Sequence, residues 1–360
     1  MEAHPSSKKI TPELIPVRKG EELDTQSLIA YLSEKLEGVD ASLRVEQFAG
    51  GHANLTYFLC FGNYEYVLRR PPLGPVAATS HDMGREYRVL SVLYKAFPPA
   101  PRSLLYCEDP SVIGAPFFIM ERRRGTVVRE VIPEEYGGGK DPRINRLLSE
   151  VLIDTMAELH AVDYRSIGLE GLGKPQGFME RQVRGWTERF ERAKTKEIDC
   201  LKDLTEWLMN KLPESPAPTL IHNDWRLDNM MLDSKDPGKV SAVFDWDMCT
   251  IGDPLADLGC LLSFWFEEGE GFGMGAMPSH LPGFMTRQEA VKRYGERCGR
   301  DISKIAFYHA FGMFKMAGIV QQIYYRYHKG QTQDPRFQYF GMAAEMLLTL
   351  AWSTAQSSGL

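Results

Sequence analysis

Residues 219–258 read TLIHNDWRLDNMMLDSKDPGKVSAVFDWDMCTIGDPLADL, and this stretch decides the fold. Short apolar runs that are typical of buried strands alternate here with loops rich in Asp and Asn. His222, Asp224 and Asn229 follow the first apolar run, and Asp245 follows the run that ends at Phe244. The pattern therefore predicts that polar groups gather at the ends of buried strands.

The types and spacing of these polar groups are typical of phosphoryl transfer. That reaction needs a carboxylate that orients the attacking hydroxyl and accepts its proton, and oxygen ligands for a metal ion that bridges the phosphates. Asp224 and Asn229 lie five residues apart, as do the catalytic Asp and Asn of kinase loops, and Asp245 supplies a second carboxylate. Alone, such an Asp and Asn would more often form a turn. Together with Asp245 they favour a catalytic site.

The rest of the second part of the chain is mainly helical by its pattern. Apolar residues recur at helical spacing over 144–162. Further helices are predicted near residues 177–211, 286–298, 302–328 and 336–357. Residues 266–285, FEEGEGFGMGAMPSHLPGFM, are too long and too rich in glycine for a simple connection, and they predict a functional loop.

The first part of the chain predicts a small antiparallel sheet with one packed helix. The runs LRVEQF, NLTYFLCF, YEYVLRR, SLLYCE and PFFIME have strand patterns, and a helix is expected over about 79–96. The polar start of the chain predicts an arm without chemistry. We expect an arm over residues 1–24, a first, nucleotide-binding lobe over 25–121 and a second lobe over 122–360 that holds the catalytic loop and the acceptor site.

Composition and charge narrow the function classes. The chain has 360 residues, with 42 Lys and Arg against 48 Asp and Glu, a net charge of −6. Because no overall positive field would attract a phosphate backbone, nucleic acid is not an expected partner. The six cysteines are scattered without metal-binding spacing, and no apolar run reaches the ~20 residues needed to cross a bilayer. We expect a cytoplasmic protein with no membrane partner.

The sequence resembles the aminoglycoside phosphotransferase-like kinases, which share the protein-kinase fold. HNDWRLDN is similar to their H-G-D-x-x-x-x-N loop, FDWD to their metal-binding strand end and TIGDPLADL to the signature that follows. GGHANLTY, VLRRPPLGP, GREYRVL and IGAPFFIMER resemble the kinase-like domains associated with acyl-CoA dehydrogenases. The resemblance implies an α+β, protein-kinase-like two-lobe fold, with a small antiparallel-sheet N-lobe and a larger, mainly helical C-lobe, that uses ATP and Mg²⁺.

The same resemblance implies roles in the catalytic loop. Asp224 would be the catalytic base, Asn229 and Asp245 would bind magnesium, and Asp253 would brace the loop. His222 is a candidate base by its chemistry, but it resembles a structural residue that hydrogen-bonds the backbone. We expect the structural role.

Nucleotide contacts are expected in the first lobe. Gly50 and Gly51 lie between two strands, where their backbone amides could cradle phosphate oxygens; a plain turn is the alternative. Asn54 matches the family, although Ala53 stands where many members have a Ser. By resemblance, the backbone near Glu121 should hydrogen-bond the adenine.

A cation at the end of the third strand is expected to position the nucleotide phosphates. The aligned residue is Arg69, where kinases have a Lys, and its partner would be Glu86 in the following helix. Arg70 is the alternative, but alternation along a strand would direct it to the opposite face.

We expect a small-molecule acceptor, and the residues between 264 and 285 indicate its chemical class. Aminoglycosides carry several positive charges and would need carboxylates. Glu267, Glu268 and Glu270 are acidic, yet many apolar side chains in this segment, Trp265 and Met285 among them, suit an acyl chain or simply cap the helical core.

The likeness to kinase-like domains implies a hydroxyacyl-CoA or hydroxy acid as acceptor, and a functional link to an acyl-CoA dehydrogenase. Basic residues including Lys315, Arg326, Lys329 and those over 122–124 could hold the CoA phosphates. An aminoglycoside or amino-alcohol kinase and a catalytically silent nucleotide-binding protein are the alternatives.

Overall fold

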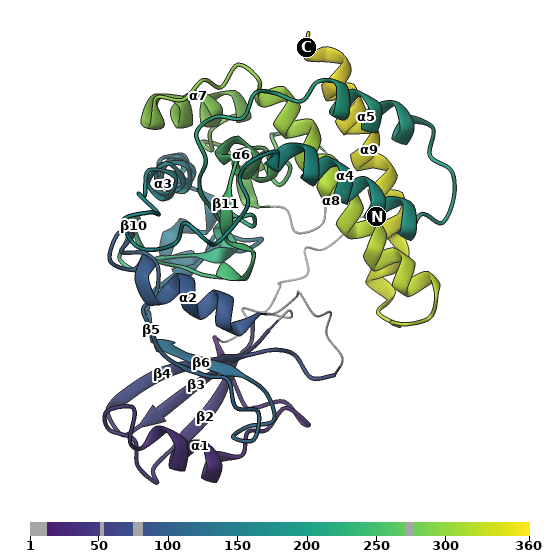
Figure 1. Cartoon of the computed structure of the whole chain (residues 1–360). Coiled ribbons are helices and arrows are strands. Elements are labelled where there is room, and N and C mark those ends of the chain that lie inside the picture. The colour runs from purple at the N-terminus through teal and green to yellow at the C-terminus, as the bar shows by residue number, and fades with distance from the viewer. Residues whose placement is uncertain (1–12, 51–53, 75–81, 271–276) are drawn as a thin grey trace, which may run out of the picture. The chain divides into compact units, whose positions relative to one another are not determined.

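The computed structural model describes residues 13–50, 54–74, 82–270 and 277–360 (Figure 1). Contacts divide the chain into two compact units, Met1–Arg123 and Arg124–Leu360. Gly51 and the first half of the expected arm lie outside the described residues.

The first unit is built on a six-stranded antiparallel sheet. The strand order is β1-β2-β3-β4-β6-β5. The strands are β1 (Leu14–Ile15), β2 (Arg44–Phe48), β3 (Leu55–Phe61), β4 (Tyr64–Arg70), β5 (Ser103–Cys107) and β6 (Phe117–Glu121). A two-residue turn joins β3 to β4, and Gly62 adopts a φ of 56° there, which L residues rarely do. This turn sets Phe61 opposite Tyr64 and fixes the register of both strands.

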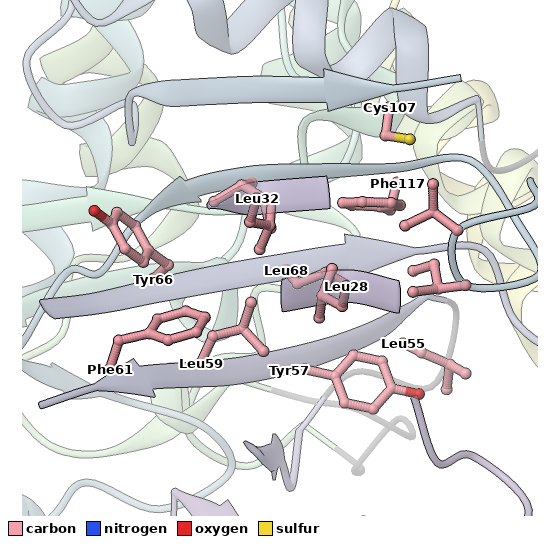
Figure 2. Packing of buried hydrophobic residues seen from close by; sticks show 13 residues of the cluster. Leu28, Leu32, Leu55, Tyr57, Leu59, Phe61, Tyr66, Leu68, Cys107 and Phe117 are labelled. Carbon is pink, nitrogen blue, oxygen red and sulfur yellow. The ribbon is translucent and has the colours of Figure 1, made fainter. Parts of the chain in front are cut away.

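Two helices accompany this sheet, α1 (Thr25–Leu32) and α2 (Met83–Leu93). Alternate residues of β3, Tyr57, Leu59 and Phe61, face the same core as Leu28 and Leu32 of α1 (Figure 2). The period of two along the strand and the helical spacing in α1 therefore bury matching apolar faces. Helix α2 packs against β5 and β6.

Part of the predicted arm belongs to the sheet instead. Leu14 pairs with Phe48 and Ile15 with Gln47, so β1 forms an edge strand next to β2. Arg18 extends this contact, because its backbone N–H donates to the Gln47 side chain at 3.0 Å. Two strand residues are too few to leave a recognisable alternation, which is why the sequence pattern suggested an arm.

The second unit is mainly helical and carries two small sheets. Its helices are α3 (Pro142–His160), α4 (Phe178–Ala193), α5 (Asp199–Asn210), α6 (Pro254–Leu262), α7 (Arg287–Cys298), α8 (Ile305–His328) and α9 (Phe340–Ser357). One sheet has the order β10-β9-β7 and the other β11-β8. Their strands are β7 (Thr126–Val127), β8 (Thr219–Ile221), β9 (Met230–Asp233), β10 (Asp236–Val243) and β11 (Thr250–Gly252). In the described residues, no helix combines the length and hydropathy that a membrane crossing requires.

Helices α6 and α8 approach each other at two glycines. A Cβ added at Gly312 would lie 2.3 Å from the backbone oxygen of Gly259, and a Cβ at Gly259 would lie 2.3 Å from that of Tyr308. Neither position can hold a larger residue without displacing a backbone. The close crossing brings side chains of α8 next to α6 and to the loop that follows β8.

Candidate active site

The loop after β8 brings Asp224 and Asn229 into direct contact. The Asn229 Nδ2 donates to Oδ2 and to the backbone oxygen of Asp224, both at 2.8 Å. Asn229 lies at the end of the short 3-10 turn Leu227–Asn229, directly before β9. Because both bonds use the amide nitrogen, the carbonyl oxygen of the Asn229 side chain is the atom that a metal ion would take.

Asp245 lies just after β10 and directly follows Phe244, whose backbone is hydrogen-bonded to that of Asn229. The Phe244 N–H donates to the Asn229 carbonyl at 2.8 Å. Asp245 itself has a φ of 65° and precedes the 3-10 turn Trp246–Met248. Such a left-handed non-glycine residue is uncommon and concentrates at functional sites. Within the described ranges, no group of three or more His, Cys, Asp or Glu forms a metal cage. The Asn229 and Asp245 oxygens suit magnesium, which commonly takes one or two protein ligands and completes its shell with phosphate and water oxygens.

His222 uses both ring nitrogens on the backbone. Its Nε2 donates to the Phe244 carbonyl at 2.8 Å, and its Nδ1 accepts the Asp224 N–H at 3.3 Å. The ring is buried between Trp225 and Trp246, with centroids 5.5 and 4.9 Å away. These contacts are those of the structural residue that the sequence suggests, and they leave neither nitrogen for a substrate proton.

The carboxylate that holds the catalytic loop is that of Asp257. Its Oδ1 accepts the Asn223 N–H at 2.6 Å, and its Oδ2 accepts the His222 N–H at 2.7 Å. The His160 Nε2 lies 3.3 Å from the same Oδ2. Burial alone would raise the pKa of Asp257, but the contacts with His160 and the backbone hydrogen bonds lower it. The side chain is therefore a buried, ionised anchor for the backbone in front of Asp224.

The expectation that Asp253 braces this loop is accordingly wrong. Asp253 caps α6, since its side chain accepts the Leu255 N–H at 3.0 Å, and it also accepts the Tyr308 hydroxyl at 2.7 Å. Burial raises the pKa of this carboxyl. Sequence reasoning missed Asp257, although the signal was present: in GDPLADL the two carboxylates lie four residues apart, on one side of a helix.

Arg226 places a positive charge beside the expected base. Its Nε lies 3.2 Å from Asp224 Oδ1, and its Nη2 lies 3.2 Å from Asp228 Oδ2. The guanidinium lies 4.7 Å from the centroid of the Phe264 ring. The group around Asp224 is therefore partly cationic and partly aromatic.

In the first unit, Arg69 and Glu86 form the expected ion pair. The Arg69 Nε lies 2.9 Å from Glu86 Oε2, and both side chains are largely buried. Arg70 lies on the opposite face, where its Nη1 donates to the Ile113 carbonyl at 2.8 Å. Asn54 is buried directly before β3. The roles of these residues toward a nucleotide, and that of Gly50, remain predictions.

The backbone at Glu121 is already partly occupied. Its N–H donates to the Arg102 carbonyl at 3.0 Å, and its side chain accepts the Arg102 N–H at 2.8 Å. An adenine contact near Glu121 would therefore need the carbonyl of this residue or a neighbouring residue. The cations that follow are engaged too, because Arg122 pairs with Glu13 at 2.7 Å and Arg123 pairs with Glu121 at 2.6 Å.

Several apolar side chains of the segment expected to line an acyl pocket belong to the core. Trp265 is fully buried, and its Nε1 donates to the Met285 carbonyl at 2.8 Å. Met277 and Phe284 are buried as well, whereas Phe272 and Met274 lie outside the described residues. The sequence could not distinguish a pocket lining from a core, because both have the same apolar composition.

Three charged residues of the acceptor prediction, Glu267, Glu270 and Lys315, contact other groups of the protein. Glu270 accepts from Arg287 at 2.7 Å, and Glu267 accepts the Arg287 backbone N–H at 2.7 Å. Lys315 is 8% exposed and contacts protein groups, so it is unavailable to a CoA phosphate.

The fold is that of the kinase-like phosphotransferases. Residues 44–279 match the model of the phosphotransferase enzyme family, and the chain belongs to this family. This confirms the resemblance and the α+β, protein-kinase-like fold predicted from the sequence.

Known proteins agree with this assignment. The chain is 36% identical over 334 residues to acyl-CoA dehydrogenase family member 11 from Homo sapiens, an alignment that covers 89% of this chain and 41% of that protein. It is 31% identical to acyl-CoA dehydrogenase family member 10 from Mus musculus, over 97% of this chain and 33% of that protein. The chain thus spans less than half the length of these relatives.

Solved structures extend the comparison. A Ralstonia eutropha protein provisionally assigned as an aminoglycoside phosphotransferase superposes with a TM-score of 0.81 and 32% identity, covering 93% of this chain and 99% of that one. Choline kinase from Cryptosporidium parvum has a TM-score of 0.62 at 13% identity, over 92% of this chain and 96% of that one, and supports the fold alone.

Proposed function

We propose that this protein transfers the γ-phosphoryl group of ATP to a hydroxyl of a small molecule. The observation that carries the proposal is the contact between Asp224 and Asn229 in the loop between β8 and β9, in a chain of the phosphotransferase enzyme family. Magnesium, when bound, would neutralise phosphate charge, and Asn229 and Asp245 would hold it.

The chain's own groups support the following sequence of events. Asn229 fixes one oxygen of Asp224, and Arg226 lies at the other. Asp224 would accept the proton of the acceptor hydroxyl. At the same time the oxygen of that hydroxyl forms a bond to the γ-phosphorus, and the bond between the γ-phosphorus and the leaving oxygen of ADP breaks. In the first unit, Arg69 would contact the phosphates while Glu86 holds its guanidinium.

For the acceptor, we propose a hydroxyacyl-CoA or a free hydroxy acid. Arg226 beside Asp224, and Arg287 beside Glu267 and Glu270, offset part of the negative charge that a polycationic acceptor would need. The names of the relatives, acyl-CoA dehydrogenase family members 10 and 11, support an acyl thioester and a functional link to an acyl-CoA dehydrogenase. Phosphorylation would turn the hydroxyl into a leaving group for later removal.

An aminoglycoside or amino-alcohol kinase is the second candidate. It is favoured by the 32% identical Ralstonia eutropha structure, with its provisional assignment to the aminoglycoside phosphotransferases.

A panel of acceptors tests these proposals. Purified protein would be incubated with Mg-ATP and a matched hydroxyacyl-CoA, free hydroxy acid, aminoglycoside or choline, with ADP release and product mass as readouts. We expect a product that is heavier than the hydroxyacyl-CoA or hydroxy acid by the mass of one HPO₃ group, about 80 Da. Product from the aminoglycoside or choline alone would overturn the acceptor assignment. No product from any acceptor, with ATP still bound, would support a silent nucleotide-binding protein.

A further inference from the structure

The residue before the expected base has an unusual backbone conformation. Asn223 has a φ of 69°, and only it and Asp245 have positive φ among the described non-glycine residues. The corresponding position of the H-G-D-x-x-x-x-N loop is Gly, which takes this conformation without penalty. For other L residues the left-handed region is strained, with Asn among the least affected. Some contact must therefore hold Asn223 in place.

Groups from three elements fix Asn223. Its N–H donates to Asp257 of α6 at 2.6 Å, and its Nδ2 donates to the Met248 carbonyl at 2.9 Å. Its carbonyl accepts the Nζ of Lys315, from the middle of α8, at 3.2 Å. The backbone donor, the backbone acceptor and the side-chain amide of this one residue are all engaged.

The Lys315 contact acts on the peptide that carries Asp224. The carbonyl of Asn223 and the N–H of Asp224 belong to one planar unit. Lys315 holds the oxygen of this unit, and His222 Nδ1 accepts its N–H at 3.3 Å. A peptide held at both ends cannot rotate, and its orientation sets the direction in which Asp224 leaves the backbone.

Lys315 reaches this peptide because of the glycine crossing. Gly312 lies one helical turn before Lys315, and Gly259 directly precedes Cys260, whose Sγ lies 3.7 Å from the Nζ. In the part of the chain that the structure describes, the Nζ contacts a carbonyl and a thiol, and Lys315 is 8% exposed. The hydrogen bonds of this lysine therefore go to the catalytic loop and to α6.

We propose that Lys315 is a positioning residue, which fixes the Asn223–Asp224 peptide and permits Asn where the family loop has Gly. The proposal rests on the phosphotransferase function for its catalytic consequence. It predicts that Lys315 and Asn223 are coupled: the lysine matters most when residue 223 disfavours the left-handed conformation.

A double-mutant cycle tests this coupling. K315M, N223G and the double variant would be compared with wild type by kcat and KM with the best acceptor of the panel, by calorimetric Mg-ATP affinity, and by hydrogen exchange of a peptide spanning residues 219–230. K304M is the matched control, because Lys304 is exposed at the start of the same helix. K315Q, which keeps an N–H donor without the charge, serves if K315M does not fold.

We expect K315M to lower kcat at least ~10-fold with nearly unchanged ATP affinity, and to speed exchange in the loop peptide. In the N223G background both effects should shrink at least ~3-fold, and K304M should match wild type. Equal losses in both backgrounds, or wild-type kcat and exchange in K315M, would overturn the proposal. If wild type phosphorylates no acceptor, the proposed function fails, while the exchange measurements still decide whether Lys315 fixes the loop.

Discussion

Replacing Asp257 with Asn should destabilise the protein by several kcal/mol. The carboxylate receives the N–H groups of Asn223 and His222 at 2.6 and 2.7 Å, and the side chain is fully buried. An Asn has one acceptor oxygen and would present its NH₂ group to the second donor. A hydrogen bond to a charged group contributes about 1.5–3 kcal/mol, and an unsatisfied buried donor costs about 1–3 kcal/mol. We therefore expect a loss of about 3–5 kcal/mol in the free energy of unfolding.

The loss should depend on pH with a defined sign. The pKa of Asp257 is lowered in the folded protein, so the folded state binds this proton less readily than the unfolded chain. Its stabilisation is complete above the unfolded pKa of about 4, and it is lost as pH falls through the folded pKa. The difference between wild type and D257N should be constant near neutral pH and narrow under acid conditions.

Urea unfolding of wild type and D257N, from about pH 3 to about pH 7, measures the difference in their free energies of unfolding. D253N is the control with the opposite sign, because burial raises the pKa of Asp253. Stability from that carboxyl is present below the unfolded pKa and declines as pH rises, so the effect of D253N should become smaller toward neutral pH. A loss below about 1 kcal/mol in D257N, or a loss that grows as pH falls, would refute the reasoning.

Substitutions at three further positions test the assigned roles. D245A should weaken ATP binding and remove its dependence on magnesium; calorimetry that finds unchanged, magnesium-independent affinity would exclude this residue from the site. D224N should keep ATP affinity while turnover falls at least ~100-fold, and near-wild-type turnover would contradict its role as base. R69A should raise the KM for ATP and lower kcat, whereas R69K should keep part of the activity because the charge remains. Normal kinetics in R69A would shift this role to Arg70 or to no residue.

Local sequence patterns predicted many of the strands and helices, and the ion pair between Arg69 and Glu86. Strand alternation separated Arg69 from Arg70, and the structure places them on opposite faces, with Glu86 of α2 at Arg69. The spacing in HNDWRLDN predicted polar groups gathered at strand ends, and the structure places Asp224 and Asn229 in contact. Both predictions depend on short stretches of chain whose geometry is set by the backbone.

Predictions that needed tertiary packing did worse. Asp253 and Asp257 are the same residue type and lie four residues apart. Only the structure shows that α6 begins after Asp253, which makes Asp253 the helix cap and leaves Asp257 to hold the catalytic loop. Trp265 and Met285 have the composition of a pocket lining, but a hydrogen bond between them closes a core. A buried cation such as Lys315 leaves no pattern at all, because its partner is a backbone carbonyl 92 residues away in the chain.

Because Gly259 and Gly312 are in contact, a substitution at either glycine would affect the catalytic loop even though neither residue belongs to that loop. Adding one methyl group at either glycine would push α8 away from α6 and withdraw Tyr308 and Lys315 from Asp253 and Asn223 at the same time. Any separation of these two helices would therefore change both hydrogen bonds together.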